Sequence, residues 1–274
     1  MKVTEFTDEY ELAAPLFDST AAELRAESLS PGSRRWLAVD DGVAVAAATS
    51  MVRPDDRVFL RFVGDAEAYG PLADGVIATL GRRVHAFTRS EEMLAALERA
   101  GFGIENVTED FAVPFDRALA LTSRAWLPSG YSLHRADEVD EDRLFALDNM
   151  LRRDVPGSDG WRGNREWFHD ELHGDPAFDP SAYLVAREEN SGEYVGLTRI
   201  WRNDSGPRLG LIGVRRHHRG STLAPFMLHR ALESAATWGS EVFHTGTSLS
   251  NRAVYPKLSR IGESQGLSWQ LVRE

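Results

Sequence analysis

Hydrophobic and polar positions follow the same order in two parts of the chain. The segment "RVFLRFVGDAEAYGPLADGVI" (57–77) aligns without a gap with "RLGLIGVRRHHRGSTLAPFML" (208–228). In each copy a strand pattern is followed by a polar loop, a turn of small residues and an apolar period typical of a helix. The pattern therefore predicts an internal duplication.

The flanking segments continue this correspondence. Upstream, "WLAVDDGVAVAAATSMV" (36–52) matches "YLVAREENSGEYVGLTRIW" (183–201), and each predicts a β-hairpin. Downstream, "RRVHAFTRSEEMLAALERAGFG" (82–103) matches "SEVFHTGTSLSNRAVYPKLSRIGE" (240–263), and each predicts a strand, a loop and a helix that ends at glycine. Each copy is predicted as β-α-β-β-β-α-β-α-β, with "EDFAVPF" (109–115) and "LSWQLVR" (267–273) as its own last strand.

The two copies are expected to be joined by "DRALALTSRAWLPSG" (116–130), which starts no new pattern and closes with Pro128 and Gly130. We therefore predict an α+β protein of two tandem domains, residues 1–122 and 123–274, each with a mixed sheet flanked by helices.

Composition and charge narrow the function classes. The 274 residues carry a formal net charge of −11, which argues against a nucleic-acid or anionic-membrane binder and is compatible with a cationic amine substrate. The absence of cysteine excludes disulfides, thiolate catalysis and Cys-type metal sites. The N-terminus lacks a signal-peptide pattern and no stretch is long and apolar enough to span a membrane, so a cytoplasmic protein is expected.

A cluster of cations interrupts this acidic background after the predicted strand 209–214. Arg215, Arg216 and Arg219 precede a helix that begins among small residues. The positive end and the unpaired N–H groups of a helix N-terminus favour an anion, so the junction is predicted to bind a phosphate or pyrophosphate. A solvated basic surface is the alternative. No Walker or Rossmann glycine pattern is present.

The helix after this junction has a clear apolar period. Pro225 falls in its first turn, where its missing N–H breaks no helical bond, and Gly239 marks its end. The predicted buried positions are Leu228, Ala231, Leu232, Ala235 and Trp238.

The junction resembles motif A of the GCN5-related N-acetyltransferase (GNAT) superfamily, [QR]-x-x-G-x-[GA]. Here the motif is Arg219, Gly220, Ser221, Thr222, Leu223 and Ala224. Thr222 replaces the internal glycine, and its hydroxyl could cap the helix or donate to phosphate. The family's motif B is similar to "TSLSNRAVYPKLSRIG", with Asn251 and Gly262 at the expected spacing and Glu263 in the usual aromatic place.

The resemblance implies a fold and a reaction. Tandem members of the superfamily, including mycothiol-synthase-like enzymes, are similar in plan, and their sheets are mostly antiparallel with two central parallel strands that splay apart. Acetyl-CoA would lie there as co-substrate. Its acetyl group would pass by direct attack to a primary amine of a small molecule. The implied cofactor contacts are Ile212, Gly213 and Val214 for the pantetheine arm, Arg219 to Ala224 for the pyrophosphate, and Asn251 for the pantetheine or only as a helix N-cap.

Catalytic residues are less well defined by the resemblance. Leu258 occupies the position of the family's usual acid tyrosine, and Tyr255, about one helical turn earlier, is the candidate acid; otherwise water protonates the thiolate. The segment 152–176 is either an acceptor-binding flap or a solvated loop with a short amphipathic helix. It contains Asp154, Asp159, Trp161, Glu166, Trp167 and His169. Glu166 is the catalytic candidate of this segment, and the identity of the general base is left open. Asp154, Trp161 and Trp201 are assigned to the acceptor, with a core position as the alternative for Trp201.

Only the second copy is expected to be active. Alignment places Asp65 opposite Arg216 and Glu67 opposite His218, and two acids would repel a pyrophosphate. No metal site is expected: the adjacent His217 and His218 are neighbouring loop side chains, which rarely converge on one ion. A non-catalytic acyl-CoA sensor and an interaction scaffold are the alternative functions. The acceptor and the choice between monomer and homodimer are left open.

Overall fold

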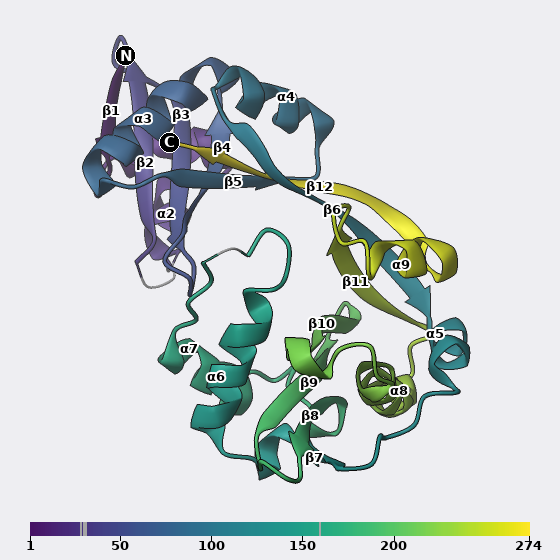
Figure 1. Cartoon of the computed structure of the whole chain (residues 1–274). Helices are drawn as coiled ribbons and strands as arrows, with labels where there is room; N and C mark the ends of the chain where they lie inside the picture. Colours follow the sequence, from purple (N-terminus) through teal and green to yellow (C-terminus); the bar gives the residue numbers. More distant parts are fainter. Residues whose placement is uncertain (28, 30–31, 159) are drawn as a thin grey trace. The chain divides into compact units, whose positions relative to one another are not determined.

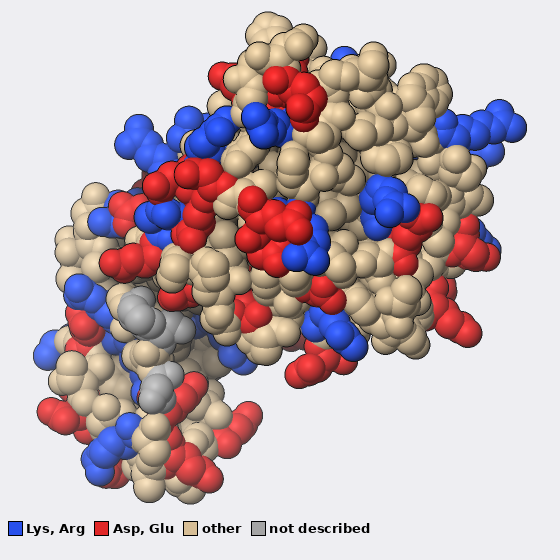
Figure 2. Space-filling model, turned by 90° about the horizontal axis from the view of Figure 1, so that it is seen from below, with Lys and Arg blue, Asp and Glu red and all other residues tan. Residues whose placement is uncertain are grey.

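The structure is a computed structural model that describes residues 1–27, 29, 32–158 and 160–274. The chain forms two compact units, Met1–Val107 with Leu267–Glu274 (unit 1) and Thr108–Gly266 (unit 2). No helix in the described part of the chain is long and apolar enough to cross a membrane. On the face shown in Figure 2, Lys and Arg side chains are interspersed with Asp and Glu side chains.

Unit 1 contains a sheet that follows the order β1-β2-β3-β4-β5-β12. Its strands are β1 (Lys2–Glu5), β2 (Arg34–Asp40), β3 (Val43–Val52), β4 (Val58–Gly64), β5 (Val84–Thr88) and the end of β12 (Glu263–Arg273). Its helices are α1 (Tyr10–Ala13), α2 (Ala21–Ala26), α3 (Tyr69–Leu80) and α4 (Glu91–Arg99), with 3-10 turns at Ala14–Phe17 and Ala66–Ala68. The pair β4–β5 is parallel, whereas the pairs β1–β2, β2–β3, β3–β4 and β5–β12 are antiparallel.

Unit 2 contains a sheet that follows the order β7-β8-β9-β10-β11-β6. Its strands are the end of β6 (Gly103–Pro114), β7 (Tyr131–Arg135), β8 (Tyr183–Glu188), β9 (Tyr194–Asn203), β10 (Gly206–Val214) and β11 (Val242–Ser248). Its helices are α5 (Phe115–Thr122), α6 (Glu141–Arg152), α7 (Arg165–His173), α8 (Leu223–Ala235) and α9 (Tyr255–Ile261) (Figure 1). Four 3-10 turns lie at Ala136–Glu138, Pro180–Ala182, Arg216–His218 and Ala236–Trp238.

Both faces of the unit 2 sheet are covered. Successive strand residues point to opposite faces, and Leu184 and Val185 of β8 are both buried, in different hydrophobic clusters. Leu184 packs in the cluster that contains Leu232 of α8, and Val185 in the cluster that contains Leu147 of α6. The predicted period of α8 is confirmed, since Ala231, Leu232 and Ala235 are fully buried. Leu228 and Trp238 are partly buried, and Gly239 follows with a φ of 87°.

The last strands do not stay with their own copies. Trp269 to Arg273 of β12 pair with Thr88 to Val84 of β5 in unit 1, and residues 108–114 of β6 pair with β11 in unit 2. The expectation that each copy keeps its own last strand is therefore wrong. The two copies have equivalent strands, so the hydrophobic pattern alone does not decide which neighbour each one pairs with.

The expected join contains structure that the pattern did not predict. Residues 116–130 were expected to start no element, but Phe115–Thr122 form α5. Phe115 and Ala118 are buried in the cluster that also holds Ala231 and Leu232 of α8. Packing against α8 therefore stabilises a helix that is too short to be stable alone. The proposed functional division at residues 122 and 123 falls inside unit 2.

Candidate functional site

The two central parallel strands of unit 2 separate almost at once. In the described structure, their ladder contains one register pair, Arg208 with His244, and the hydroxyl of Thr245 reaches the Leu209 carbonyl at 3.5 Å. By contrast, β10 pairs with β9 as far as Val214, and β11 pairs with β6 from Val242 to Ser248. Beyond Leu209, the β10 edge that faces β11 is therefore left without a strand partner in the ladder. In unit 1, three register pairs join β4 and β5.

A bulge lies where β10 leaves β11. The β9–β10 register shifts between Leu209 and Leu211, and an added Cβ on Gly210 would come within 2.7 Å of the Trp201 ring nitrogen. Bulges of this kind are frequent next to active sites, where they re-aim the following residues. Trp201 is half-buried, and the Arg199 guanidinium lies 4.9 Å from its ring centre. The indole therefore fixes the strand at the start of the separation.

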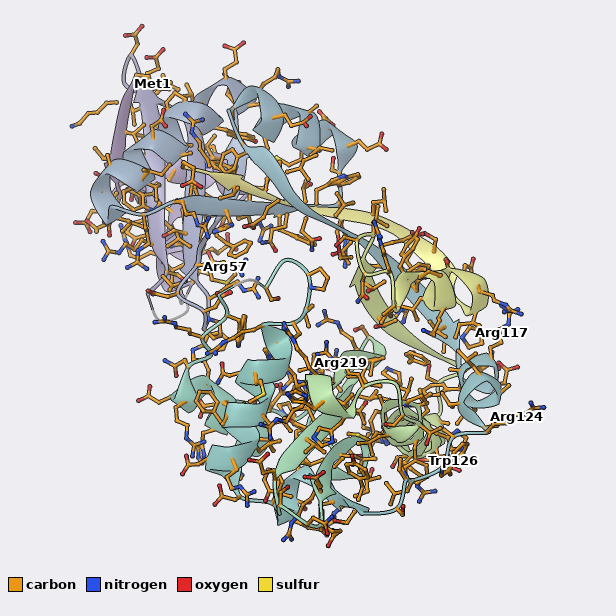
Figure 3. The ribbon with its side chains drawn as sticks, in the orientation of Figure 1. Met1, Arg57, Arg117, Arg124, Trp126 and Arg219 are labelled. Carbon is orange, nitrogen blue, oxygen red and sulfur yellow. The ribbon has the colours of Figure 1, made fainter. Side chains whose placement is uncertain are left out.

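The turn after β10 leads directly into α8. Gly220 has a φ of 82°, and a Cβ placed there would meet no atom within 4 Å. The Ser221 hydroxyl donates to the His218 carbonyl and accepts from the Leu223 N–H. The structure thus brings the predicted residues 212–214 and 219–224 together in one continuous path along the end of β10, the turn and the first residues of α8 (Figure 3).

Two side-chain caps that the sequence offered as alternatives are not formed. Thr222 occupies the N-cap position of α8, but its hydroxyl donates to the Trp126 carbonyl at 2.8 Å rather than capping the helix. Asn251 is not the N-cap of α9, because Val254 holds that position without a side-chain bond. The Asn251 carbonyl accepts instead from the N–H groups of Val254 and Tyr255. Both cap interpretations are wrong, since backbone contacts organise these turns.

Two of the three arginines at the turn are paired with one carboxylate, whereas Arg215 pairs with Glu193. Arg216 and Arg219 contact the two oxygens of Asp154 at 2.7 and 2.5 Å, and the Arg219 Nε donates to the Val214 carbonyl. The hydrogen bond from Arg216 lowers the pKa of Asp154, and Arg219 adds to this effect. Asp154, expected to contact the acceptor, therefore lies at the cationic turn, where it neutralises part of the positive charge.

A tyrosine–glutamate pair lies at the separated end of β11. The Tyr255 hydroxyl donates to Glu109 of β6 at 2.8 Å, and Glu109 is the register partner of Thr247 in β11. The hydrogen bond with Glu109 and burial both raise the pKa of Tyr255. Leu258, which occupies the family's tyrosine position, is buried in the core beneath α8. Glu109 was missed because the sequence assigns its strand to the other domain.

A buried ionic network underlies α6 and α7, and it too was missed. Asp148 and Arg199 are both 4 % exposed and lie 3.6 Å apart. Arg152 contacts Asp148 at 2.7 Å, and Arg199 contacts Glu171 at 3.0 Å. Burial raises the pKa of Asp148, and it raises the pKa of Glu171 to about 7. The sequence signal was an acid and a base four residues apart on the apolar face of a helix.

The remaining acceptor candidates do not converge on one point. Trp161 is buried, with the Arg152 guanidinium 4.7 Å from its ring centre. Glu166 is exposed near the start of α7 and lines a pocket of about 430 Å³ with Glu141, Arg165, His169 and Asp170. Tyr255 is not among the residues that line this pocket. Asp159 lies outside the described residues.

The corresponding turn of unit 1 carries acids. The Asp65 carboxylate accepts from the Glu67 N–H at 3.0 Å, and the Tyr69 hydroxyl donates to the Gly64 carbonyl. The Phe62 and Tyr69 rings stack 4.7 Å apart behind this turn. The turn is therefore packed by its own aromatic residues and presents no cation of the Arg216 or Arg219 kind at these aligned positions.

Comparisons with known proteins identify the fold. Residues 144–258 match the model of the acetyltransferase (GNAT) family. A GCN5-related N-acetyltransferase from Sphaerobacter thermophilus is 18 % identical, with a TM-score of 0.61 over 100 % of this chain and 95 % of that chain. A tandem GNAT protein from the clavulanic acid biosynthesis pathway is 12 % identical, with a TM-score of 0.62 over 100 % and 98 %. No curated protein matches the chain in sequence.

Proposed function

We propose that the protein transfers an acetyl group from acetyl-CoA to a primary amine of a small molecule. The match of residues 144–258 to the GNAT family model and the similarity in fold to a tandem GNAT protein support this proposal. The observation that carries this proposal is the single register pair between β10 and β11, followed by the turn at Gly220 and the N-terminus of α8. The free edge of β10 can pair with an extended ligand, and the turn can hold its phosphates.

The coenzyme contacts follow from this geometry. Backbone groups of Ile212, Gly213 and Val214 would pair with the pantetheine arm, and Asn251 would lie beside it. The N–H groups from Gly220 to Ala224 and the Arg219 guanidinium would hold the pyrophosphate. The last part of β10 is unpaired on this side, and the space beside Gly220 is open, which supports both assignments.

Proton transfer is assigned to Tyr255 and Glu109. In direct transfer, the amine forms the new C–N bond as the C–S bond breaks, the amine loses a proton, and the leaving thiolate gains one. Tyr255 would give its proton to the thiolate and regain one from solvent. Glu109 is here a positioning residue that holds the hydroxyl. Glu166, exposed on its pocket, is proposed as the base on the acceptor side.

Unit 1 is proposed to have no coenzyme site of its own. Its β4 and β5 stay paired over three residues, and Asp65 and Glu67 replace the cations at the turn. The acidic chain favours a cationic small-molecule amine over a nucleic-acid or membrane partner. We place the protein in the cytoplasm, as a monomer or homodimer.

A second function is favoured by a specific observation. Asp154 already occupies both arginines of the turn, and Leu258 replaces the usual acid, as expected of an acyl-CoA sensor without catalysis. Thermal stability measured with increasing acetyl-CoA tests binding, because a ligand of the folded state raises the melting temperature. Thiol release across a panel of amines then tests transfer. If acetyl-CoA does not raise the melting temperature, both functions are contradicted. If it raises the melting temperature but no amine causes thiol release, the sensor is the function that is supported.

A further inference from the structure

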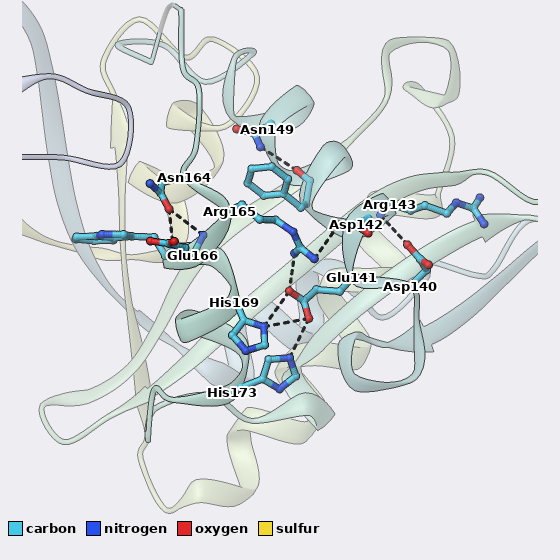
Figure 4. Close-up of polar contacts among 12 residues, drawn as sticks. Asp140, Glu141, Asp142, Arg143, Asn149, Asn164, Arg165, Glu166, His169 and His173 are labelled. Atoms are coloured by element: carbon cyan, nitrogen blue, oxygen red, sulfur yellow. Dashed lines mark hydrogen bonds and ion pairs between the residues drawn. The ribbon is translucent and has the colours of Figure 1, made fainter.

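A histidine pair and a glutamate converge on the surface of unit 2, at the opposite end of α6 from Asp154. His169 and His173 lie four residues apart on α7, so both side chains project from one face of the helix. Both rings point at Glu141, the first residue of α6 (Figure 4). The His169 Nδ1 is 3.2 Å from the Glu141 Oε1, and the His173 Nε2 is 3.0 Å from the Glu141 Oε2.

This arrangement fits the geometry of a transition-metal site. One ligand atom from each residue can be chosen so that all three lie within 4.8 Å of one another. In a tetrahedral Zn²⁺ site, ligand atoms lie about 3.4 Å apart. The Glu141 Oε2 lies 3.4 Å from the His169 Nδ1 and 3.0 Å from the His173 Nε2, which is close to that spacing. The imidazole rings are 58 % and 55 % exposed, so they can adjust by small rotations and are accessible to an ion from solvent.

We propose that Glu141, His169 and His173 bind one divalent transition-metal ion, expected to be Zn²⁺, which links α7 to the first turn of α6. Two imidazoles and a carboxylate favour Zn²⁺, Ni²⁺ or Cu²⁺ over Mg²⁺ or Ca²⁺, which prefer sets of oxygen ligands. Three protein ligands leave a coordination position for water or a ligand atom. The proposal departs from the sequence-based expectation of no metal and does not depend on acyl transfer.

Arg165 is the neighbouring group that disfavours metal binding. Its guanidinium contacts the Glu141 Oε1 at 2.5 Å and Asp142 at 2.7 Å. Because Asp142 is a second carboxylate partner, the arginine can keep one ion pair when Glu141 turns to a metal. Arg165 nevertheless lowers the affinity, since it is a like charge beside the ion. Replacing it by a neutral residue is therefore expected to strengthen metal binding.

The site can be tested by isothermal titration calorimetry, in which Zn²⁺ is added to the tag-free full chain after treatment with a chelator. We expect the wild type to bind one Zn²⁺ per chain. The variants Glu141→Gln, His169→Gln and His173→Gln should each bind Zn²⁺ at least about tenfold more weakly. Arg165→Met should bind Zn²⁺ more tightly. His217→Gln removes an exposed histidine elsewhere in unit 2 and is the matched control, which should bind as the wild type does.

Two further measurements keep the result unambiguous. Circular dichroism without metal shows whether each variant folds. One folded variant among the three is enough to compare its Zn²⁺ affinity with that of the wild type. Co²⁺ added in place of Zn²⁺ should give a visible ligand-field band that His173→Gln loses. The proposal is overturned if the wild type binds no Zn²⁺, if the folded ligand variants bind as well as the wild type, or if His217→Gln loses as much affinity as they do.

Discussion

The Tyr255 hydroxyl donates a hydrogen bond to the Glu109 carboxylate across 146 positions of sequence. The tyrosine begins α9, and the glutamate belongs to β6, the strand that unit 2 receives from the part of the chain that aligns with the first copy. The contact raises the pKa of Tyr255, so its hydroxyl stays protonated at neutral pH. A protonated hydroxyl is the state that a general acid needs at the start of a reaction.

Tyr255→Phe should lower the rate of amine-dependent thiol release by about 100-fold, the low end of the range for general acid–base catalysis. The phenyl ring keeps the edge contact with Phe111, so acetyl-CoA binding measured by calorimetry should be unchanged. Glu109→Gln should have a smaller effect, because its amide can still hold the hydroxyl. Equal rates in the wild type and Tyr255→Phe would show that water, rather than Tyr255, protonates the leaving thiolate.

Arg219→Glu should weaken acetyl-CoA binding by about tenfold or more, because it reverses a charge at the phosphate turn. Asp65→Arg, at the position of unit 1 that aligns with Arg216, should change the affinity little. Both dissociation constants can be measured by calorimetry at one salt concentration, since screening alters such contacts. Similar losses at the two sites would contradict the assignment of a single active copy.

Asp154→Asn should tighten acetyl-CoA binding by roughly threefold to tenfold, because the carboxylate competes with phosphate for Arg216 and Arg219. The gain should shrink as salt is added. Arg215, which pairs with Glu193, provides a control: Glu193→Gln removes a carboxylate that does not contact Arg216 or Arg219. Weaker binding in Asp154→Asn would show instead that the aspartate orients the two arginines.

Arg199→Met should lower the free energy of unfolding of unit 2 by about 3 kcal/mol, because it removes a buried cation that contacts both Asp148 and Glu171 and leaves Arg152 as the cation beside Asp148. The double variant Asp148→Leu with Arg199→Met should recover much of that loss, since no charge is left unpaired between these positions. Urea unfolding compares the three proteins. A double variant as unstable as Arg199→Met would mean that packing, rather than charge, sets the cost.

Leu271→Ala should destabilise unit 1 by about 2–5 kcal/mol, although the residue lies near the end of the chain. Leu271 is fully buried in the unit 1 core and pairs with Ala86 of β5. Hydrogen exchange should quicken in β5 and α3 but not in β8 or β9. Faster exchange confined to unit 2 would contradict the observed strand assignment.

Local patterns predicted the elements better than their partners. The hairpins and the period of α8 follow from residues close in sequence, such as Ala231 and Ala235, so they were predictable. The destination of β6 and β12 was not, because the duplication offers each strand two equivalent neighbours. Glu109 was missed for that reason. Asp148 and Glu171 were missed because their depth depends on how α6 and α7 pack, which a single helical period does not specify.

The exchange of β12 also sets an order of events during synthesis. Unit 1 needs Leu271 and its neighbours to complete its sheet, and these residues are translated after the whole of unit 2. Unit 2 ends at Gly266 and has all of its strands a few residues sooner. The amino-terminal unit, although translated first, therefore cannot complete its sheet until all of unit 2 has been made.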